Sequence, residues 1–203
     1  MQTTIDPHSL FENPEATALL IIDMQNDFVD PAAPLSTPRA TAIIPRIKEL
    51  ATACRERQFP VIYTQEMHRP GLEDFGIEGH FEPIHCVEGS VGAEVVAELT
   101  PVEGDHVINP KRRYDAFLGT ELDLLLRCLK VENLVITGVC TDICVISTAF
   151  HARNLDYRCF VVADGVDGTS QERHDAALLC LSHVWAYVGT SDDAAGLFKL
   201  DLP

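Results

Sequence analysis

Residues 17–22 read TALLII, an uninterrupted apolar run that ends at Asp23. A run without polar alternation is typical of a strand covered on both faces, as in a parallel sheet between two layers of helices. An amphipathic helical pattern follows, with apolar residues at positions 40, 43, 44, 47, 50 and 51, and a second β-branched run covers 60–64. These segments predict a strand, a helix and a second parallel strand, which is the βαβ unit.

The same alternation continues along the rest of the chain. The pattern predicts strands at 105–108, 134–137, 158–163 and 184–188, and helices at 120–129, 141–154 and 171–181. We therefore expect an α/β fold in three layers, α/β/α, around a mostly parallel, Rossmann-like sheet of six strands. No internal repeat or linker interrupts the pattern, so residues 1–203 are predicted to form a single domain.

The composition indicates a globular protein and excludes several other classes. The 203 residues are 46% hydrophobic and 23% charged, unlike a collagen, a coiled-coil rod or a disordered tail. The longest apolar run is far shorter than the ~20 residues of a membrane helix, and the N-terminus carries no basic and apolar signal segment. We expect no membrane partner and a cytoplasmic location.

Charge and cysteine content narrow the partners further. The chain has 31 acidic residues against 15 Lys and Arg, a formal net charge of −16 that repels nucleic-acid phosphates and anionic lipids. Its seven cysteines are an odd number without a signal segment, which indicates free thiols in a reducing compartment. We expect no nucleic-acid partner, and at least one thiol could carry chemistry.

The segment 65–92 is the longest stretch without clear periodicity, and it contains three histidines and five glycines. Loops of this length in a compact domain are usually functional. We interpret the segment as a lid or pocket wall, with a solvated excursion as the alternative.

Three residues that can carry chemistry follow the predicted strands. Asp23 ends the first, Lys111 follows the third, and Cys144 lies between the fourth strand and its helix. Ligands of open parallel sheets bind beyond the carboxyl ends of the strands, so these side chains can converge. The first helical turn also favours a thiolate at Cys144. From these residues alone, an activated nucleophile and a buried structural thiol both stay open, as does an ordinary strand-end role for Asp23.

Three motifs occur in register: DMQNDF at 23–28, KRRYDAF at 111–117 and GVCTDICV at 138–145. In this order and spacing they resemble the isochorismatase-like cysteine hydrolase superfamily. That superfamily includes N-carbamoylsarcosine amidohydrolase, biuret and ureidoacrylate hydrolases, nicotinamidases and isochorismatases. The resemblance covers about residues 16–189, nearly the whole chain.

The resemblance implies a role for each matching position. Cys144 corresponds to the nucleophile, Asp23 to a proton shuttle, and Lys111 to a cation beside both. The implied oxyanion hole consists of the backbone N–H groups of Cys140 and Cys144, with a cis peptide bond between Val139 and Cys140.

The function implied is a cysteine-dependent amidohydrolase. It would cleave a C–N bond of a small linear amide, ureide or N-carbamoyl compound through a thioester and release ammonia or amine. Isochorismatases proper cleave a vinyl ether and typically have a small residue at the nucleophile position, whereas this chain keeps Cys144. The alternatives are a nicotinamidase-like, metal-assisted amidase, a redox dithiol of Cys140 and Cys144, and a non-catalytic small-molecule binding protein. Family members usually form dimers or tetramers, so we expect a homo-oligomer.

Four residues resemble a metal site of nicotinamidases, which is an Asp-x-His pair with two further histidines. They are Glu66, His68, His80 and His85. Glu replaces Asp at position 66, the spacing from His68 to His80 is longer than that pattern usually shows, and ureide hydrolases with a similar loop need no metal. We therefore expect no cofactor, and these residues are the candidate ligands if a divalent metal binds.

The candidates for contact with the substrate lie near the motifs. They are Phe28, Arg112, Tyr114 and Phe117. Core packing is the alternative for the three aromatic residues, and an ion pair with one of the many acidic residues is the alternative for Arg112.

Overall fold

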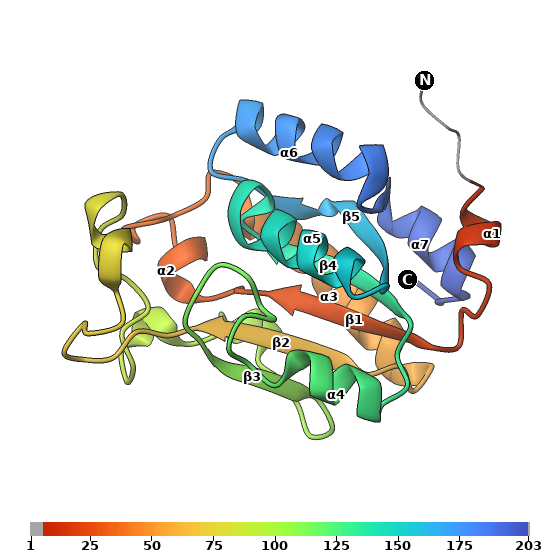
Figure 1. Ribbon diagram of the computed structural model, residues 1–203, viewed down its shortest axis with the longest axis horizontal. Helices are drawn as coiled ribbons and strands as arrows, with labels where there is room; N and C mark the ends of the chain where they lie inside the picture. Colours follow the sequence, from red (N-terminus) through yellow and green to blue (C-terminus); the bar gives the residue numbers. More distant parts are fainter. Residues whose placement is uncertain (1–5, 203) are drawn as a thin grey trace.

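A computed structural model describes residues 6–202 and confirms the expected architecture. Six parallel strands form one sheet in the order β3-β2-β1-β4-β5-β6, and helices lie on both of its faces (Figure 1). Because β1 pairs with both β2 and β4, the strand order reverses at β1, and this reversal is where open α/β sheets place their ligand sites.

The elements have the following bounds. The strands are β1 (Thr17–Ile22), β2 (Val61–Glu66), β3 (His106–Lys111), β4 (Asn133–Val139), β5 (Arg158–Asp167) and β6 (Tyr187–Gly189). The α-helices are α1 (Pro7–Leu10), α2 (Asn26–Val29), α3 (Ala40–Glu56), α4 (Leu122–Cys128), α5 (Ile146–Asn154), α6 (Gln171–Val184) and α7 (Ser191–Phe198). The short turns are η1 (Gly76–His80), η2 (Val91–Ala93), η3 (Ala97–Leu99) and the π-helical η4 (Thr141–Val145).

Strand β1 lies in the middle of the sheet and is covered on both faces, since all six of its residues are buried. Leu19 and Ile21 pack into one apolar cluster with α3 and α7, whereas Leu20 and Ile22 pack into the other with α4, α5 and α6. Burying a Leu or Ile side chain stabilises the fold by about 1.5–3 kcal/mol, so this strand alone is a major part of the core.

Most predicted bounds shift by a few residues, with the third strand extending to Lys111 and the fifth to Asp167, and two elements differ more. The helix expected at 141–154 begins as the π turn η4, in which the N–H groups of Ile143 and Val145 share the Cys140 carbonyl. The sixth strand starts at Tyr187, because Val184 is the last residue of α6 and is 55% exposed. A short apolar run after an amphipathic helix cannot be divided between helix and strand from periodicity alone.

The segment 65–92 extends beyond the carboxyl ends of the strands (yellow in Figure 1). Its first two residues complete β2, and the rest is held by short turns instead of a long helix. His68 fixes it to its own far end, because the His68 N–H donates to Cys86 O and the Glu88 N–H donates to His68 O. None of the helices in residues 6–202 is both long and apolar enough to cross a membrane.

Candidate active site

Asp23, Lys111 and Cys144 come together where β1, β3 and β4 end, as the sequence predicted. Lys111 Nζ lies 2.8 Å from Asp23 Oδ2 and 3.7 Å from Cys144 Sγ. Asp23 and Lys111 are fully buried and Cys144 is 4% exposed. An acid, a cation and a thiol are therefore in contact in a place that excludes most water.

Glu66 is a fourth member of this group, although the sequence analysis considered it only as a metal ligand. Its Oε2 lies 3.2 Å from Lys111 Nζ and 3.8 Å from Cys144 Sγ. Glu66 ends β2 and is paired in register with Lys111 on β3. The signal that could have found it is its position, since an acid that ends the second strand lies at the same sheet edge as Asp23.

Two polar side chains hold these acids in place. Thr64 Oγ1 donates to Asp23 Oδ1 over 2.6 Å and accepts from the Asp23 N–H. The buried Gln25 side chain donates to the carbonyls of Glu66 and Ala93 and accepts from the Glu66 N–H, at 2.7–2.8 Å in each case. The first motif thus ties the end of β2 to the turn at 91–93.

The backbone around Cys144 is held closely against β1. Gly138 has φ +104°, and a Cβ at this position would lie 2.0 Å from Ile22 O, so only glycine fits. The peptide bond between Val139 and Cys140 is cis, as the resemblance implied.

The charges of the site interact strongly. Burial alone would lower the pKa of Lys111, but the carboxylates of Asp23 and Glu66 raise it well above its usual value, and a Cys144 thiolate would add to this effect. Burial raises the pKa of the Cys144 thiol far more than Lys111 lowers it, so the resting sulfur is protonated. The site therefore rests as an ammonium beside a neutral thiol.

The two carboxylates differ in basicity. Burial raises the pKa of Asp23, and Lys111 opposes this only in part. Burial also acts to raise the pKa of Glu66, but Lys111, His68 and His85 bring it down to about 2. Asp23 is therefore the better proton acceptor for Cys144.

A small cavity of about 30 Å³ reaches the sulfur. Its lining includes Phe28 and Tyr114, two of the four residues expected to contact a substrate. The other lining residues are Leu35, Glu66, Glu82, Cys140, Ile143, Cys144 and Thr169. Cys140 and Cys144, whose N–H groups the resemblance assigns to an oxyanion hole, thus both lie on this cavity.

The structure does not bring Arg112 or Phe117 to the cavity. The Arg112 guanidinium donates to Met67 O and pairs with Glu88, so it is held by the protein itself. Phe117 stacks against Tyr157 and belongs to the core between the sheet and α4. These are the alternatives that the sequence left open for both residues.

A second buried cluster adjoins the first. His68 Nε2 lies 3.6 Å from both Glu66 Oε1 and Glu78 Oε1, and His85 Nε2 lies 3.4 Å from Glu78 Oε1. These four atoms lie within 4.8 Å of one another, and within residues 6–202 each lacks a hydrogen-bond partner. His80 is exposed and lies outside the cluster, so Glu78 takes the place that the sequence analysis gave to His80.

The cluster has the shape of a metal site. A tetrahedral ion with ligands at roughly 2.1 Å has ligand atoms roughly 3.4 Å apart, close to the spacings of this cluster. His85 Nδ1 lies 2.8 Å from Pro83 O, a contact that leaves Nε2 as the free ligand atom. Without a metal, burial would lower the pKa of His68, but Glu66 and Glu78 raise it to about 9. The two carboxylates therefore require a cation between them, either a metal ion or a protonated His68.

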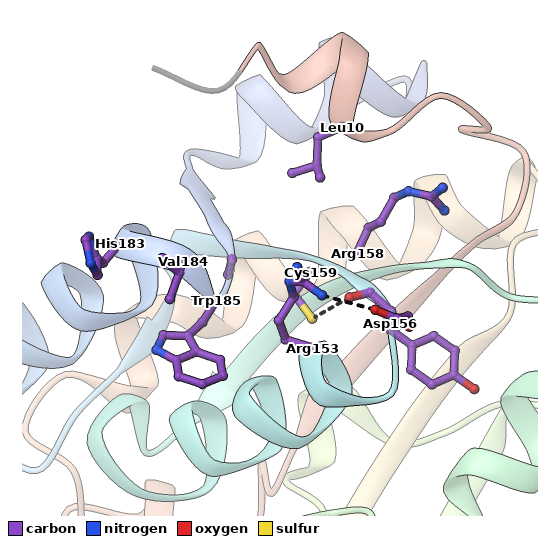
Figure 2. A pocket seen from close by; sticks show the side chains of 10 residues that line it. Leu10, Arg153, Asp156, Arg158, Cys159, His183, Val184 and Trp185 are labelled. Carbon is purple, nitrogen blue, oxygen red and sulfur yellow. Dashed lines mark hydrogen bonds and ion pairs between the residues drawn. The ribbon is translucent and has the colours of Figure 1, made fainter. Parts of the chain in front are cut away.

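A larger hollow of about 420 Å³ lies at the opposite end of the sheet, between α1, α5, α6 and the start of β5 (Figure 2). It contains Cys159, but burial raises the pKa of this thiol to about 12. Within residues 6–202 the Cys159 sulfur hydrogen-bonds to the carbonyls of Ala149 and Tyr157, and to none of the charged side chains that line the hollow. Arg153 acts to lower the pKa of this thiol, but burial outweighs it, so the thiol is not activated.

Comparison with known proteins identifies the family of the chain. The family model of the isochorismatase domain matches residues 17–193. The ureidoacrylate amidohydrolase RutB of Pseudomonas syringae is 29% identical and aligns with 95% of this chain and 88% of its own. A probable inactive nicotinamidase of Arabidopsis thaliana is 34% identical over 83% of this chain and 89% of its own.

Solved structures share the fold over most of their length. N-carbamoylsarcosine amidase from Thermoplasma acidophilum is 32% identical with a TM-score of 0.76, covering 87% of this chain and 96% of that one. Pyrazinamidase of Pyrococcus horikoshii in complex with zinc is 30% identical with a TM-score of 0.79, covering 86% and 99%. With the three motifs converging at one sheet edge and the family model spanning nearly the whole fold, the chain belongs to the isochorismatase family.

Proposed function

We propose that this protein is a cysteine-dependent amidohydrolase that cleaves a C–N bond of a small amide, ureide or N-carbamoyl compound. The observation that carries the proposal is the contact of Lys111 with both Asp23 and Cys144 at the floor of a cavity. The names of two relatives, a ureidoacrylate amidohydrolase and an N-carbamoylsarcosine amidase, support this choice of bond.

The first half of the reaction forms a thioester. Asp23 takes the proton of Cys144, and the thiolate, stabilised by Lys111, adds to the amide carbonyl. The carbonyl oxygen becomes an oxyanion, for which the N–H groups of Cys140 and Cys144 are the assigned donors. When the C–N bond breaks, Asp23 returns the proton to the departing nitrogen, and ammonia or an amine leaves.

The second half hydrolyses the thioester. Asp23 deprotonates a water molecule, whose oxygen adds to the thioester carbon, and the C–S bond breaks as the acid is released. The proton returns to the sulfur, so the site ends as it began. One carboxylate serves both halves because its pKa is raised and its neighbour Glu66 stays charged.

The test is ammonia release from biuret, N-carbamoyl amino acids, ureidoacrylate-like acids, maleamate and nicotinamide. Cys144→Ala should abolish release while circular dichroism and melting temperature stay unchanged. The matched control is Cys128→Ala, since Cys128 is exposed on α4. Hydroxylamine added in place of water should give a hydroxamate if a thioester forms, and substantial turnover by Cys144→Ala would contradict the covalent mechanism.

We also propose that Glu66, His68, Glu78 and His85 hold a divalent metal ion, in which case the enzyme is a metal-assisted amidase. The support is the buried, unpartnered tetrad described above and the zinc complex of a pyrazinamidase relative. A bound metal ion there would supply positive charge beside the cavity. Of these four residues, Glu66 also lines the cavity and so connects the tetrad to the cavity wall.

A further inference from the structure

The cavity that leads to Cys144 has an unusual balance of charge. Among the residues that line it, the charged side chains are Glu66 and Glu82, and the remaining polar groups, such as Tyr114 and Thr169, are neutral. No Lys or Arg is among these lining residues in the described part of the chain. A substrate therefore enters a space whose walls carry two acids and no basic side chain.

The nearby cations are already engaged. The Lys111 ammonium lies beneath the cavity between Asp23 and Glu66. Arg112 is held by Met67 and Glu88, and Arg113 donates to Asp74 O.

Arg173 is the one cation at the rim of the cavity that the described residues show. It is exposed on α6 and donates to Thr169 Oγ1 over 3.2 Å. A substrate carboxylate therefore meets two acids in the cavity wall. Lys111, and a metal ion in the tetrad if one is bound, are already paired with acids, and Arg173 lies only at the outer edge.

Glu82 differs from Glu66 in what surrounds it. Glu66 lies against Lys111 and within the histidine tetrad. Glu82 follows η1, is half-buried, and has no Lys or Arg within 4 Å of its carboxylate in residues 6–202. Its polar neighbours are the Tyr114 hydroxyl and His85, so no ion pair with Lys or Arg competes with a donor that the substrate brings.

We propose that Glu82 is a specificity-determining residue. It accepts N–H donors from a neutral or cationic amide or ureide, and it repels substrates that carry a carboxylate close to the scissile carbonyl. This inference rests on the proposed amidohydrolase function and names the substrate class within it. A half-buried carboxylate discriminates between a hydrogen-bond donor and a like charge, because water screens it only in part and a repelled charge is costly there.

The first test compares two substrates of nearly equal size and opposite character. Succinamide and succinamate both present a primary amide, but the far group is a second amide in one and a carboxylate in the other. We expect kcat/KM of the wild type to favour succinamide at least tenfold, and Glu82→Gln to reduce this preference at least tenfold. Glu73→Gln is the matched control, because it removes an exposed acid of the same segment away from the cavity.

The second test does not depend on turnover. Iodoacetamide carries a neutral amide and iodoacetate carries a carboxylate, and both alkylate thiols. Peptide mass spectrometry measures the rate at which each reagent alkylates each cysteine. The ratio of the two rates at Cys144 should exceed that at the exposed Cys128 at least tenfold, and Glu82→Gln should bring the two ratios together.

The outcomes separate the two proposals. Selective alkylation at Cys144 without hydrolysis of any amide would refute the amidohydrolase and leave the role of Glu82 standing. Equal ratios at Cys144 and Cys128, or a ratio that Glu82→Gln does not change, would overturn the role of Glu82. A wild-type preference for succinamate that Arg173→Gln removes would overturn it as well, because the rim arginine would then select the substrate.

Discussion

Two acids lie within reach of the same sulfur, so the identity of the base is a question at the scale of single residues. Asp23 and Glu66 both contact Lys111, and both lie within 4.8 Å of Cys144 Sγ. They differ in proton affinity, because Glu66 also faces His68 and His85 while Asp23 has only Lys111 as a cationic neighbour among its strong interactions. Asp23, which interacts with one cation, can therefore act as the base, whereas Glu66, which interacts with three, stays negatively charged.

Asp23→Asn should remove the base and lower kcat by about 10²–10⁴, the usual contribution of general-base catalysis. Glu66→Gln should keep at least tenfold more activity than Asp23→Asn, because the pKa of Glu66 near 2 makes it a weak base. Steady-state ammonia release and the rate of thiol alkylation measure both variants. If Glu66→Gln were the more damaging substitution, Glu66 would be the base and the assignment of Asp23 would be wrong.

The sequence predicted that residues at the ends of recognisable strands would lie close together. Asp23, Lys111 and Cys144 each follow a recognisable apolar run, so topology alone brings them together. Glu78 and Glu82 lie in a segment without periodicity, where only the folded turns decide which acids face inward.

At the scale of elements, the conformation of the segment 65–92 depends on the contacts between its C-terminal part and the end of β2. The four tetrad residues come from separate places in the segment. Glu66 ends β2, His68 follows two residues later, Glu78 lies in the turn η1, and His85 lies in the chain after that turn. Periodicity could not predict this arrangement because the segment has neither a helical nor a strand pattern. The three-layer fold, in contrast, can be predicted from apolar runs such as β1, because such runs are buried regardless of the details of the flanking segments.

A metal in the tetrad should therefore stabilise the segment. At a free concentration 100 times its Kd, a bound ion contributes about 2.7 kcal/mol, which corresponds to roughly 5–10 °C in Tm for a chain of this size. Elemental analysis of the purified protein measures its metal content. Calorimetry before and after chelation measures the change in Tm. His85→Ala should remove the metal, whereas His80→Ala, an exposed histidine of the same segment, should not. Metal-free protein with an unchanged Tm after chelation would show that a protonated His68 fills the tetrad instead.

Helix α6 and the turn η4 meet through a histidine. His174 is buried on α6, and its Nδ1 lies 2.9 Å from Thr141 Oγ1. Burial and the nearby Arg39 lower its pKa, although Asp167, Asp175 and Asp142 oppose this. The folded protein thus favours the neutral ring.

This shift gives a pH dependence with a definite sign. As the pH falls below about 6.5, the unfolded chain binds a proton at His174 before the folded chain does, so stability is present above that pH and is lost below it. His174→Gln should flatten the fall in Tm between about pH 7 and pH 5.5, measured by thermal denaturation. His183→Gln, at an exposed position of the same helix, is the control. An equal effect of both substitutions would contradict the assignment.

At the scale of the whole molecule, several exposed apolar side chains lie in the segment that contributes Glu66 and Glu82 to the cavity wall. Ile77, Phe81, Ile84 and Val91 are 57–81% exposed, and all four lie between residues 76 and 92. A chain with a net charge of −16 repels its copies over most of its surface, so contact between copies favours apolar regions. We propose that the protein forms a homo-oligomer through this segment.

Sedimentation velocity should give a mass of at least twice 22.4 kDa for the wild type. Phe81→Ser should shift the population toward the monomer and lower activity, because the same segment carries Glu82. Leu124→Ser, at a 65% exposed position on α4, should leave the mass unchanged. A monomeric wild type at micromolar concentration would refute the proposal.

Glu66 belongs to two clusters at once, with Oε2 beside Lys111 and Cys144 and Oε1 in the tetrad. In evolutionary terms, the clusters are coupled at position 66. A lineage that abandoned the histidines would still have to keep this glutamate for its lysine, and a shortening to aspartate would withdraw an oxygen from one cluster or the other. The histidines can therefore be replaced without loss of the lysine cluster, whereas a replacement of Glu66 alters both.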